Sequence, residues 1–262
     1  MRYEYINAEQ RHDDRCLEEI GHHMEKNYIL AGPLRAILEG HEVEVLKTLK
    51  ANGENVQVSW NANVQGWVVC SKNVALVARE RAHIVLHKED RFQFAREMAH
   101  VWFDSLEAMQ KSGKSIDELK ADLNGNTLIG EYIGSQDHQH LVKYSRVTLI
   151  FYAVVCNSSS EDCWPCERSW ALFDKYGFDK VIIQSLGRFT DYNKMCDTLC
   201  QTFKDVAKSE IAQEEEGNVL YFVKRPKTGE AEVMSLCKLK TLEYRLFRKM
   251  REKLRNYHAR PD

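Results

Sequence analysis

Residues 50–54, Lys-Ala-Asn-Gly-Glu, constrain the fold most, because they lie between two segments with the alternation of β-strands. Residues 43–46 read Val-Glu-Val-Leu, and residues 55–60 read Asn-Val-Gln-Val-Ser-Trp, with apolar side chains at every second position. A strand, a turn and a second strand could place the amine of Lys50 at the floor of a cleft. Gly53 would let the backbone approach a ligand closely. A lone lysine of this kind is commonly a solvated turn residue, so its function depends on residues further along the chain.

The composition is that of a soluble globular protein of one large domain or two small ones. The chain has 262 residues, of which 44% are hydrophobic and 29% charged. No apolar run is long enough to cross a membrane, and the charged N-terminus lacks the apolar core of a signal peptide. We therefore expect a cytoplasmic or nuclear protein whose 8 cysteines are free thiols. A net charge of −2 requires any RNA-binding surface to be a local patch.

The first 87 residues predict helices followed by strands. Residues 1–40 carry helical stripes interrupted by Gly32 and Pro33, which predicts a helical buttress. Residues 41–87 predict a β meander, in which the strand over residues 66–72 ends in Ser71 and Lys72. The next strand is expected over residues 74–78.

Helical spacing returns over residues 89–111 and in a short segment at 116–123. Two strands are then expected, at residues 127–134 and 149–155, and the first contains Glu131. A carboxylate in an apolar strand costs free energy unless it is paired or faces a site. The alternative is an edge strand with Glu131 in water.

Two close pairs of cysteines follow, Cys163 with Cys166 and Cys196 with Cys200. Such pairs can form a structural zinc site in an intracellular protein. Because Cys196 and Cys200 lie four residues apart on a helical stretch, free thiols are the better interpretation.

The last part of the chain combines acidic, basic and apolar patterns. Three glutamates end at Glu216, directly before Gly217 and an apolar strand. Lys238 and Lys240 lie two apart on a strand, so both amines project from one face, where an anion could lie between them. A solvated strand face is the alternative. From Thr241 onward the spacing predicts a helix with an apolar stripe and basic residues on its other faces. The stripe is Leu242, Leu246, Met250 and Leu254.

In this order, Lys50, Ser71 with Lys72, Glu131, Phe151, Glu216, and Lys238 with Lys240 resemble the motif set of the covalent nucleotidyltransferases. That superfamily contains the polynucleotide ligases and the mRNA capping enzymes. The resemblance covers residues 41–240 and implies an α+β nucleotidyltransferase (ligase adenylation) fold, with mostly antiparallel sheets flanked by helices. It divides the chain into the buttress (1–40), an adenylyltransferase core (41–240) and a C-terminal basic helix packed on the core (241–262).

The segment after Lys240 indicates the branch of the superfamily. DNA ligases and capping enzymes append an oligonucleotide-binding (OB) barrel, for which residues 241–262 leave no room. We therefore expect no C-terminal barrel and a closer resemblance to the RNA ligases of the phage type and the fungal-type tRNA ligases. Lys-Ala-Asn-Gly-Glu is similar to the tRNA-ligase nucleophile motif, with Asn52 where the superfamily commonly has Asp.

The resemblance implies a reaction in three steps. Lys50 attacks the α-phosphate of ATP to form lysyl-AMP, AMP passes to an RNA 5′-phosphate, and an RNA 3′-hydroxyl displaces it. Lys238 and Lys240 would neutralise the phosphate charge, and Glu216 would hold Mg²⁺ or Mn²⁺. Cations close to a lysine lower its pKa and free the amine for attack.

The resemblance also implies the binding residues. Glu131 would accept hydrogen bonds from the ribose, and adenine would lie between Val219 and Phe151, or Tyr152 in its place. The other residues expected to bind ATP are Asn52, Gly53, Lys72, Lys238 and Lys240. On the C-terminal helix, Arg245, Arg248 and Lys249 would contact RNA phosphates.

Two other functions remain open at this level. One is a catalytically silent protein that binds RNA ends and uses the nucleotide pocket as a sensor. The other is an adenylyltransferase that passes AMP to a different acceptor. No kinase or phosphodiesterase domain is visible, so we expect the RNA ends to be healed by another protein or by another chain segment.

Overall fold

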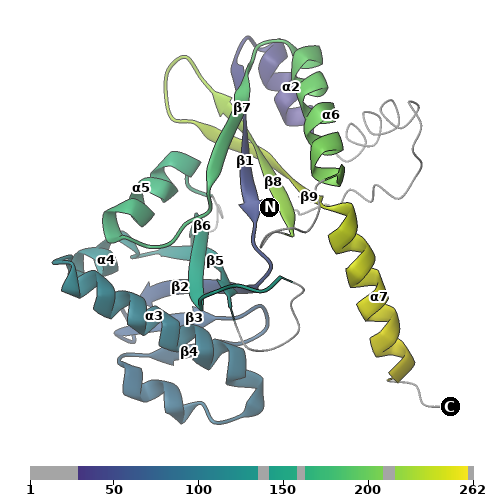
Figure 1. The fold of residues 1–262 in the computed structure, drawn as a ribbon. Helices are drawn as coiled ribbons and strands as arrows, with labels where there is room; N and C mark the ends of the chain where they lie inside the picture. The colour runs from purple at the N-terminus through teal and green to yellow at the C-terminus, as the bar shows by residue number, and fades with distance from the viewer. Residues whose placement is uncertain (1–28, 135–141, 158–162, 209–215, 259–262) are drawn as a thin grey trace. The chain divides into compact units, whose positions relative to one another are not determined.

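The computed structural model describes residues 29–134, 142–157, 163–208 and 216–258. The chain divides into two compact units (Figure 1). Unit 1 comprises residues 1–50 and 182–262, and unit 2 comprises residues 51–181. Unit 1 is discontinuous in sequence because β-strands from distant parts of the chain pair in one sheet. The helices predicted within residues 1–28 lie outside the described residues.

Unit 1 contains an antiparallel sheet of four strands in the order β7-β1-β8-β9. The strands are β1 (Glu42–Lys50), β7 (Ile183–Phe189), β8 (Gly217–Arg225) and β9 (Glu232–Lys240). The central pair runs in register from Glu42 opposite Arg225 to Lys50 opposite Gly217. This pairing joins the segment that ends in Lys50 to a strand from a distant part of the sequence.

Helices α2 (Ala31–Leu38) and α6 (Tyr192–Lys208) pack on one face of this sheet. Their apolar residues meet the odd-numbered side chains of β1, because alternate residues of a strand point to opposite faces. The buried cluster contains Leu30, Ala36, Val43, Val45, Met195, Leu199, Leu220, Phe222, Cys237 and Leu239. The opposite face carries the even-numbered residues of β1, among them Lys50.

Unit 2 contains an antiparallel sheet of five strands in the order β4-β3-β2-β5-β6. The strands are β2 (Glu54–Asn61), β3 (Gly66–Cys70), β4 (Ala75–Ala78), β5 (Asn126–Ile133) and β6 (Thr148–Cys156). Around them lie the 3-10 helices η1 (Arg81–Leu86) and η2 (Asp90–Phe92), and the α-helices α3 (Gln93–Lys111), α4 (Ile116–Asp122) and α5 (Cys166–Tyr176).

The predicted helical stripe of residues 89–111 is the buried side of α3. Trp102 is fully buried and contacts the rings of Trp67, Phe151 and Phe178. Tyr132 of β5 donates a hydrogen bond of 3.0 Å to Glu97 of α3, so α3 covers the face of the sheet from which Tyr132 projects. This aromatic cluster is the core of unit 2.

The predicted β meander over residues 41–87 is wrong at its first connection. β1 belongs to the sheet of unit 1, whereas β2 begins the sheet of unit 2, so residues 51–53 connect two sheets and do not form a hairpin turn. Alternation predicts strands but not their partners, and β1 finds its partners in β7 and β8. β3 also ends at Cys70, two residues earlier than predicted.

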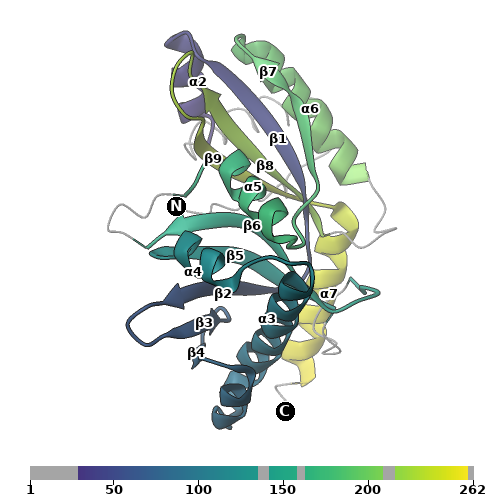
Figure 2. The same ribbon diagram turned by 90° about the vertical axis from the view of Figure 1, so that its left-hand side faces the viewer.

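The C-terminal helix is present as α7 (Leu242–His258), which extends beyond the end of β9 (Figures 1 and 2). Thr241 and Tyr244, at its start, are buried. Its predicted apolar stripe does not pack on a core, because Leu246, Met250 and Leu254 are each more than half exposed. No helix in the described part of the chain is both long and apolar enough to cross a membrane.

Candidate functional site

The face of β1, β8 and β9 opposite α2 and α6, called the lysine face here, gathers the predicted site residues of unit 1. In one row across the three strands, Lys50, Gly217 and Lys240 are paired, and in the next row Thr48, Val219 and Lys238 are paired. The register therefore brings Lys50, Lys238 and Lys240 to one face, as the alternation in β9 predicted for the last two.

Glu216 is held beside this row by main-chain hydrogen bonds on both of its sides. Its N–H donates to the carbonyl oxygen of Lys50 over 3.1 Å, and its carbonyl oxygen accepts from the N–H of Thr241 over 3.3 Å. Gly217 has a φ of 145°, and a Cβ there would collide with the carbonyl oxygen of Leu239. The Glu-Gly sequence is needed because only glycine lets the chain pass this close to β9.

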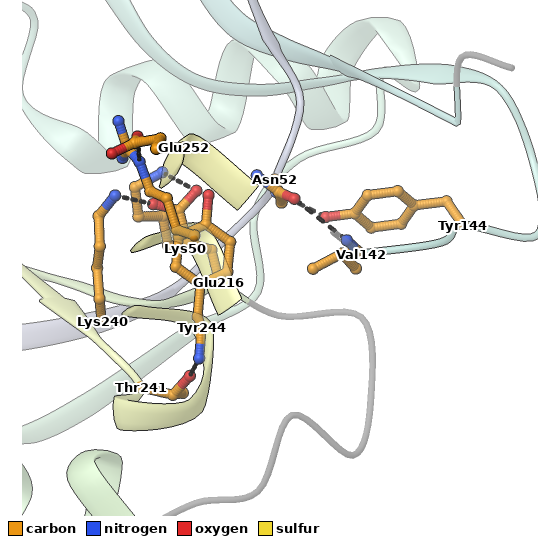
Figure 3. Close-up of polar contacts among 10 residues, drawn as sticks. Lys50, Asn52, Val142, Tyr144, Glu216, Lys240, Thr241, Tyr244 and Glu252 are labelled. Atoms are coloured by element: carbon orange, nitrogen blue, oxygen red, sulfur yellow. Dashed lines mark hydrogen bonds and ion pairs between the residues drawn. The ribbon is translucent and has the colours of Figure 1, made fainter. Parts of the chain in front are cut away.

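The carboxylate of Glu216 forms ion pairs with two of the predicted lysines (Figure 3). Nζ of Lys50 lies 2.9 Å from Oε2, and Nζ of Lys240 contacts Oε1. Burial by itself raises the pKa of Glu216, but the charges of Lys50 and Lys240 outweigh it and hold that pKa below its ordinary value. The site therefore contains an ionised carboxylate between two amines.

Tyr244 is a fourth member of this cluster that the sequence analysis missed. Its side chain is buried, it hydrogen-bonds to Glu216, and Nζ of Lys240 lies 5.1 Å from its ring centroid. Burial and the carboxylate of Glu216 raise the pKa of Tyr244, so its phenol is protonated at neutral pH. Thr241 caps α7 by accepting the N–H of Tyr244 over 3.1 Å. The available signal was an aromatic residue one helical turn after Lys240.

In unit 2, Glu131 projects from the face of the sheet opposite α3. Asn55 of β2 and Ile150 of β6 are its partners in register. The neighbouring residues Val56 and Val58 are fully buried on the α3 side, so Asn55 and Glu131 share the other face. We call this the Glu131 face; it also carries Gln57, Ser59 and Tyr152. The edge-strand alternative is wrong, because β5 lies between β2 and β6.

Phe151 does not occupy the place predicted for an adenine-stacking residue. Its side chain is 1% exposed and packs against the rings of Trp102, Phe173 and Phe178 on the α3 side of the sheet. A shift of register between Ile129 and Gly130 leaves Tyr152 as the extra residue of a β-bulge. Tyr152, the alternative to Phe151, is therefore the aromatic residue on the Glu131 face.

Asn52 and Gly53 have structural contacts within unit 2. Oδ1 of Asn52 accepts the N–H of Val142 over 3.2 Å, and the N–H of Asn52 donates to the hydroxyl of Tyr144 over 2.7 Å (Figure 3). A Cβ on Gly53 would collide with the carbonyl oxygen of Tyr132. The close approach that requires glycine here is therefore to strand β5.

The remaining predicted residues lie on exposed elements. Lys72 follows β3 in an exposed turn. On α7, Arg245 is half-buried, Lys249 is exposed, and Nε of Arg248 donates to Glu252 over 2.8 Å.

Among the described residues, no three histidine, cysteine or acidic side chains lie close enough to hold a metal ion by themselves. Cys163 and Cys166 belong to unit 2, whereas Cys196 and Cys200 lie on α6 of unit 1. Mg²⁺ in nucleotide sites is bound by one or two carboxylates together with substrate phosphates. Glu216 fits that donor set as a single carboxylate.

Comparison with known proteins identifies the family of the chain. The RNA ligase family matches residues 33–246, and no curated protein matches the chain. A variant of the Naegleria gruberi RNA ligase solved with ATP and Mn is 16% identical, with a TM-score of 0.53, over 85% of this chain and 55% of that one. Another variant, with AMP and Mn, is 15% identical over the same shares of both chains, with a TM-score of 0.53.

An archaeal ATP-dependent RNA ligase is 14% identical, with a TM-score of 0.46, over 78% of this chain and 44% of that one. The chain thus spans about half the length of these solved ligases. The two Naegleria structures share the mixed fold of helices and antiparallel sheets described above. The match over residues 33–246 covers most of the sequence, and the chain therefore belongs to the RNA ligase family.

Proposed function

We propose that this chain catalyses ATP-dependent RNA ligation through a lysyl-AMP intermediate on Lys50. The observation that carries the proposal is the cluster in unit 1, where Lys50 and Lys240 flank the buried carboxylate of Glu216. A cluster with two amines and one carboxylate is suited to a polyanionic substrate. Family membership and the N. gruberi ligase solved with ATP and Mn support ATP and a divalent metal ion as the cofactors.

In the first step, the deprotonated amine of Lys50 forms a bond to the α-phosphorus of ATP, and its nitrogen then loses a proton to solvent. The bond from that phosphorus to the bridging oxygen breaks, and pyrophosphate leaves with the electron pair. Lys240 and Lys238, on the same face, neutralise negative charge on the phosphate in the transition state. The ion pair with Glu216 orients the side chain of Lys50 before ATP binds.

A bound Mg²⁺ or Mn²⁺ would withdraw charge from the phosphate oxygens. Glu216 would hold the ion together with those oxygens. Since both carboxylate oxygens of Glu216 contact lysines here, the ion and Lys50 would compete for the same carboxylate. After Lys50 departs from Glu216, loss of a proton to solvent would leave its amine available for attack.

For unit 2 we propose contacts to the nucleoside. Glu131 accepts hydrogen bonds from ribose hydroxyls, and Tyr152 stacks on adenine. In the later steps AMP passes to an RNA 5′-phosphate and an RNA 3′-hydroxyl displaces it, with Arg245, Arg248 and Lys249 on RNA phosphates. The healed ends would come from another protein or from another chain segment.

The test is the transfer of label from α-labelled ATP to the protein with Mg²⁺. Lys50→Ala should abolish labelling. Lys50→Arg keeps the positive charge beside Glu216 but supplies no nucleophilic amine, so it should also be unlabelled while remaining folded. Lys47→Ala is the matched control, because Lys47 lies on the same strand and pairs with Leu220, whose side chain is on the opposite face of the sheet from Lys50. Labelling of Lys50→Arg would contradict the proposal.

A second assay identifies the acceptor. Labelled protein is mixed with RNA that carries a 5′-phosphate and a 3′-hydroxyl, and joined RNA is expected. Label that stays on the protein without joined RNA would favour transfer of AMP to another acceptor. Binding of ATP without labelling of the wild-type protein would favour the nucleotide sensor.

A further inference from the structure

A chain of polar side chains on the Glu131 face ends on the hydroxyl of Tyr152. Nε2 of Gln57 donates to Oδ1 of Asn55 over 3.0 Å. Nδ2 of Asn55 donates to the hydroxyl of Tyr152 over 3.3 Å and to the carbonyl oxygen of Gly130 over 3.4 Å. The contacts connect side chains of β2 to the bulge of β6.

The β-bulge in β6 accounts for the direction of the Tyr152 side chain. Phe151 lies opposite Gly130 and points to the α3 side, whereas Ala153 lies opposite Ile129, so Tyr152 has no residue of β5 opposite it. A side chain at such a position is aimed less strictly by the sheet than its neighbours are. The contact with Asn55 adds a constraint at the far end of the ring.

We infer that Asn55, supported by Gln57, is a positioning residue that fixes the hydroxyl of Tyr152 and thereby orients its ring for stacking on a purine base. The inference rests on the proposed function for the location of the nucleotide. Its physical basis is preorganisation, because a ring already held in its bound orientation loses less conformational freedom when a base stacks on it. Glu131, opposite Asn55 in register, places the ribose contact beside the ring.

The first measurement is the kinetics of lysyl-AMP formation in the full chain. Asn55→Leu and Tyr152→Phe each remove the contact and keep the ring, and each should raise KM for ATP by about 3- to 10-fold, with kcat changed less than about twofold. The double variant should be little worse than the poorer single variant, because both changes break one contact. Tyr152→Leu removes the ring and should raise KM by more than about tenfold. Ser59→Ala, on the same strand and face, is the control and should match wild type.

The second measurement is equilibrium binding in a Lys50→Met background, which cannot form lysyl-AMP. Calorimetry compares ATP with inorganic tripolyphosphate, a probe without a base. Asn55→Leu and Tyr152→Phe should weaken the binding of ATP by the same factor by which they raise KM. They should leave the affinity for tripolyphosphate unchanged. Equal loss of affinity for both probes would indicate a general disturbance of the fold and would overturn the inference.

The two proposals fail separately in these assays. If wild-type protein is labelled but the variants bind ATP normally, the positioning role of Asn55 is wrong and the ligase proposal stands. If wild-type protein is not labelled but the variants still lose ATP affinity selectively, the ligase proposal is wrong and the positioning role stands. Additive effects in the double variant would contradict coupling through one contact.

Discussion

Nζ of Lys50 and Oε2 of Glu216 lie 2.9 Å apart, although Lys50 ends β1 and Glu216 directly precedes β8, far along the chain. The pairing of β1 with β8 brings them together, and the same register places Lys240 on the other carboxylate oxygen. The site in unit 1 is thus a property of the sheet, and changes that disturb strand register should affect both stability and activity.

Glu216→Gln should remove labelling and lower the free energy of unfolding by about 3 kcal/mol at pH 7, because it leaves two nearly buried lysines without their carboxylate. Urea unfolding measures the loss. The pKa of Glu216 in the fold lies below its unfolded value of 4.5, so the ionised carboxylate stabilises the protein above that pH. The difference between wild type and Glu216→Gln should therefore stay constant at higher pH and shrink as the pH falls through the folded pKa. A difference that grows on acidification would contradict this assignment.

Gly217→Ala should destabilise the protein by more than about 3 kcal/mol and abolish labelling, because its Cβ would collide with the Leu239 carbonyl at a φ of 145°. Gly229→Ala is the matched control. Gly229 also has a positive φ, of 100°, but a Cβ there meets nothing within 4 Å. Gly229→Ala should therefore lower the free energy of unfolding only by the cost of backbone strain, about 1–2 kcal/mol. Equal losses in the two variants would show that the close approach to β9 is unimportant.

Asn52→Asp should label at close to the wild-type rate, because a carboxylate can still accept the N–H of Val142. Asn52→Leu leaves that buried N–H without its acceptor and should lower the free energy of unfolding by about 2 kcal/mol, with slower labelling. Thermal unfolding and the labelling rate measure the two effects. If Asn52→Asp were as damaging as Asn52→Leu, the amide group would have a role that this hydrogen bond does not explain.

Replacing Arg245, Arg248 and Lys249 together by Ala should weaken binding of single-stranded RNA by about 10- to 100-fold at low salt. The negative slope of log affinity against log salt concentration should become shallower by about 2, since three phosphate contacts are lost. Labelling by ATP should be unchanged. The control replaces three basic residues of unit 2, Lys88, Arg91 and Lys111, and should leave the slope as in wild type. Equal losses in both triple variants would indicate binding by overall charge.

Replacing Leu246, Met250 and Leu254 by Gln should change the free energy of unfolding by less than about 0.5 kcal/mol each, because these side chains are 53–59% exposed. Leu220→Ala, in the fully buried core of unit 1, should cost about 2–5 kcal/mol. Chemical denaturation compares the four variants. A large loss in the α7 variants would indicate that the stripe packs on a core, as its spacing predicted.

Much of the local structure could be predicted from periodicity. The helical spacing of residues 89–111 and the apolar runs at 127–134 and 149–155 correspond to α3, β5 and β6. The partners of the strands could not be predicted, because alternation specifies which side chains share a face and not which strand lies alongside. The meander was wrong for this reason, since β1 pairs with β7 and β8.

In the candidate site, too, relationships within one strand could be predicted and those between strands could not. Lys238 and Lys240 share a face because they lie two apart on one strand, a relationship within a few residues. Phe151 and Tyr152 could not be distinguished, because the bulge that shifts the register at Gly130 depends on the pairing of β6 with β5. Tyr244 was missed because its contact with Glu216 depends on how α7 begins after β9.

The sequence by itself determined the residue types of this chemistry, their order and the strands or helices that carry them, since these depend on side-chain pattern over short distances. Only the tertiary structure decided that Glu216 lies between Lys50 and Lys240, that Phe151 is core, and that the apolar stripe of α7 is exposed. These outcomes depend on pairing between distant segments, which local pattern does not encode.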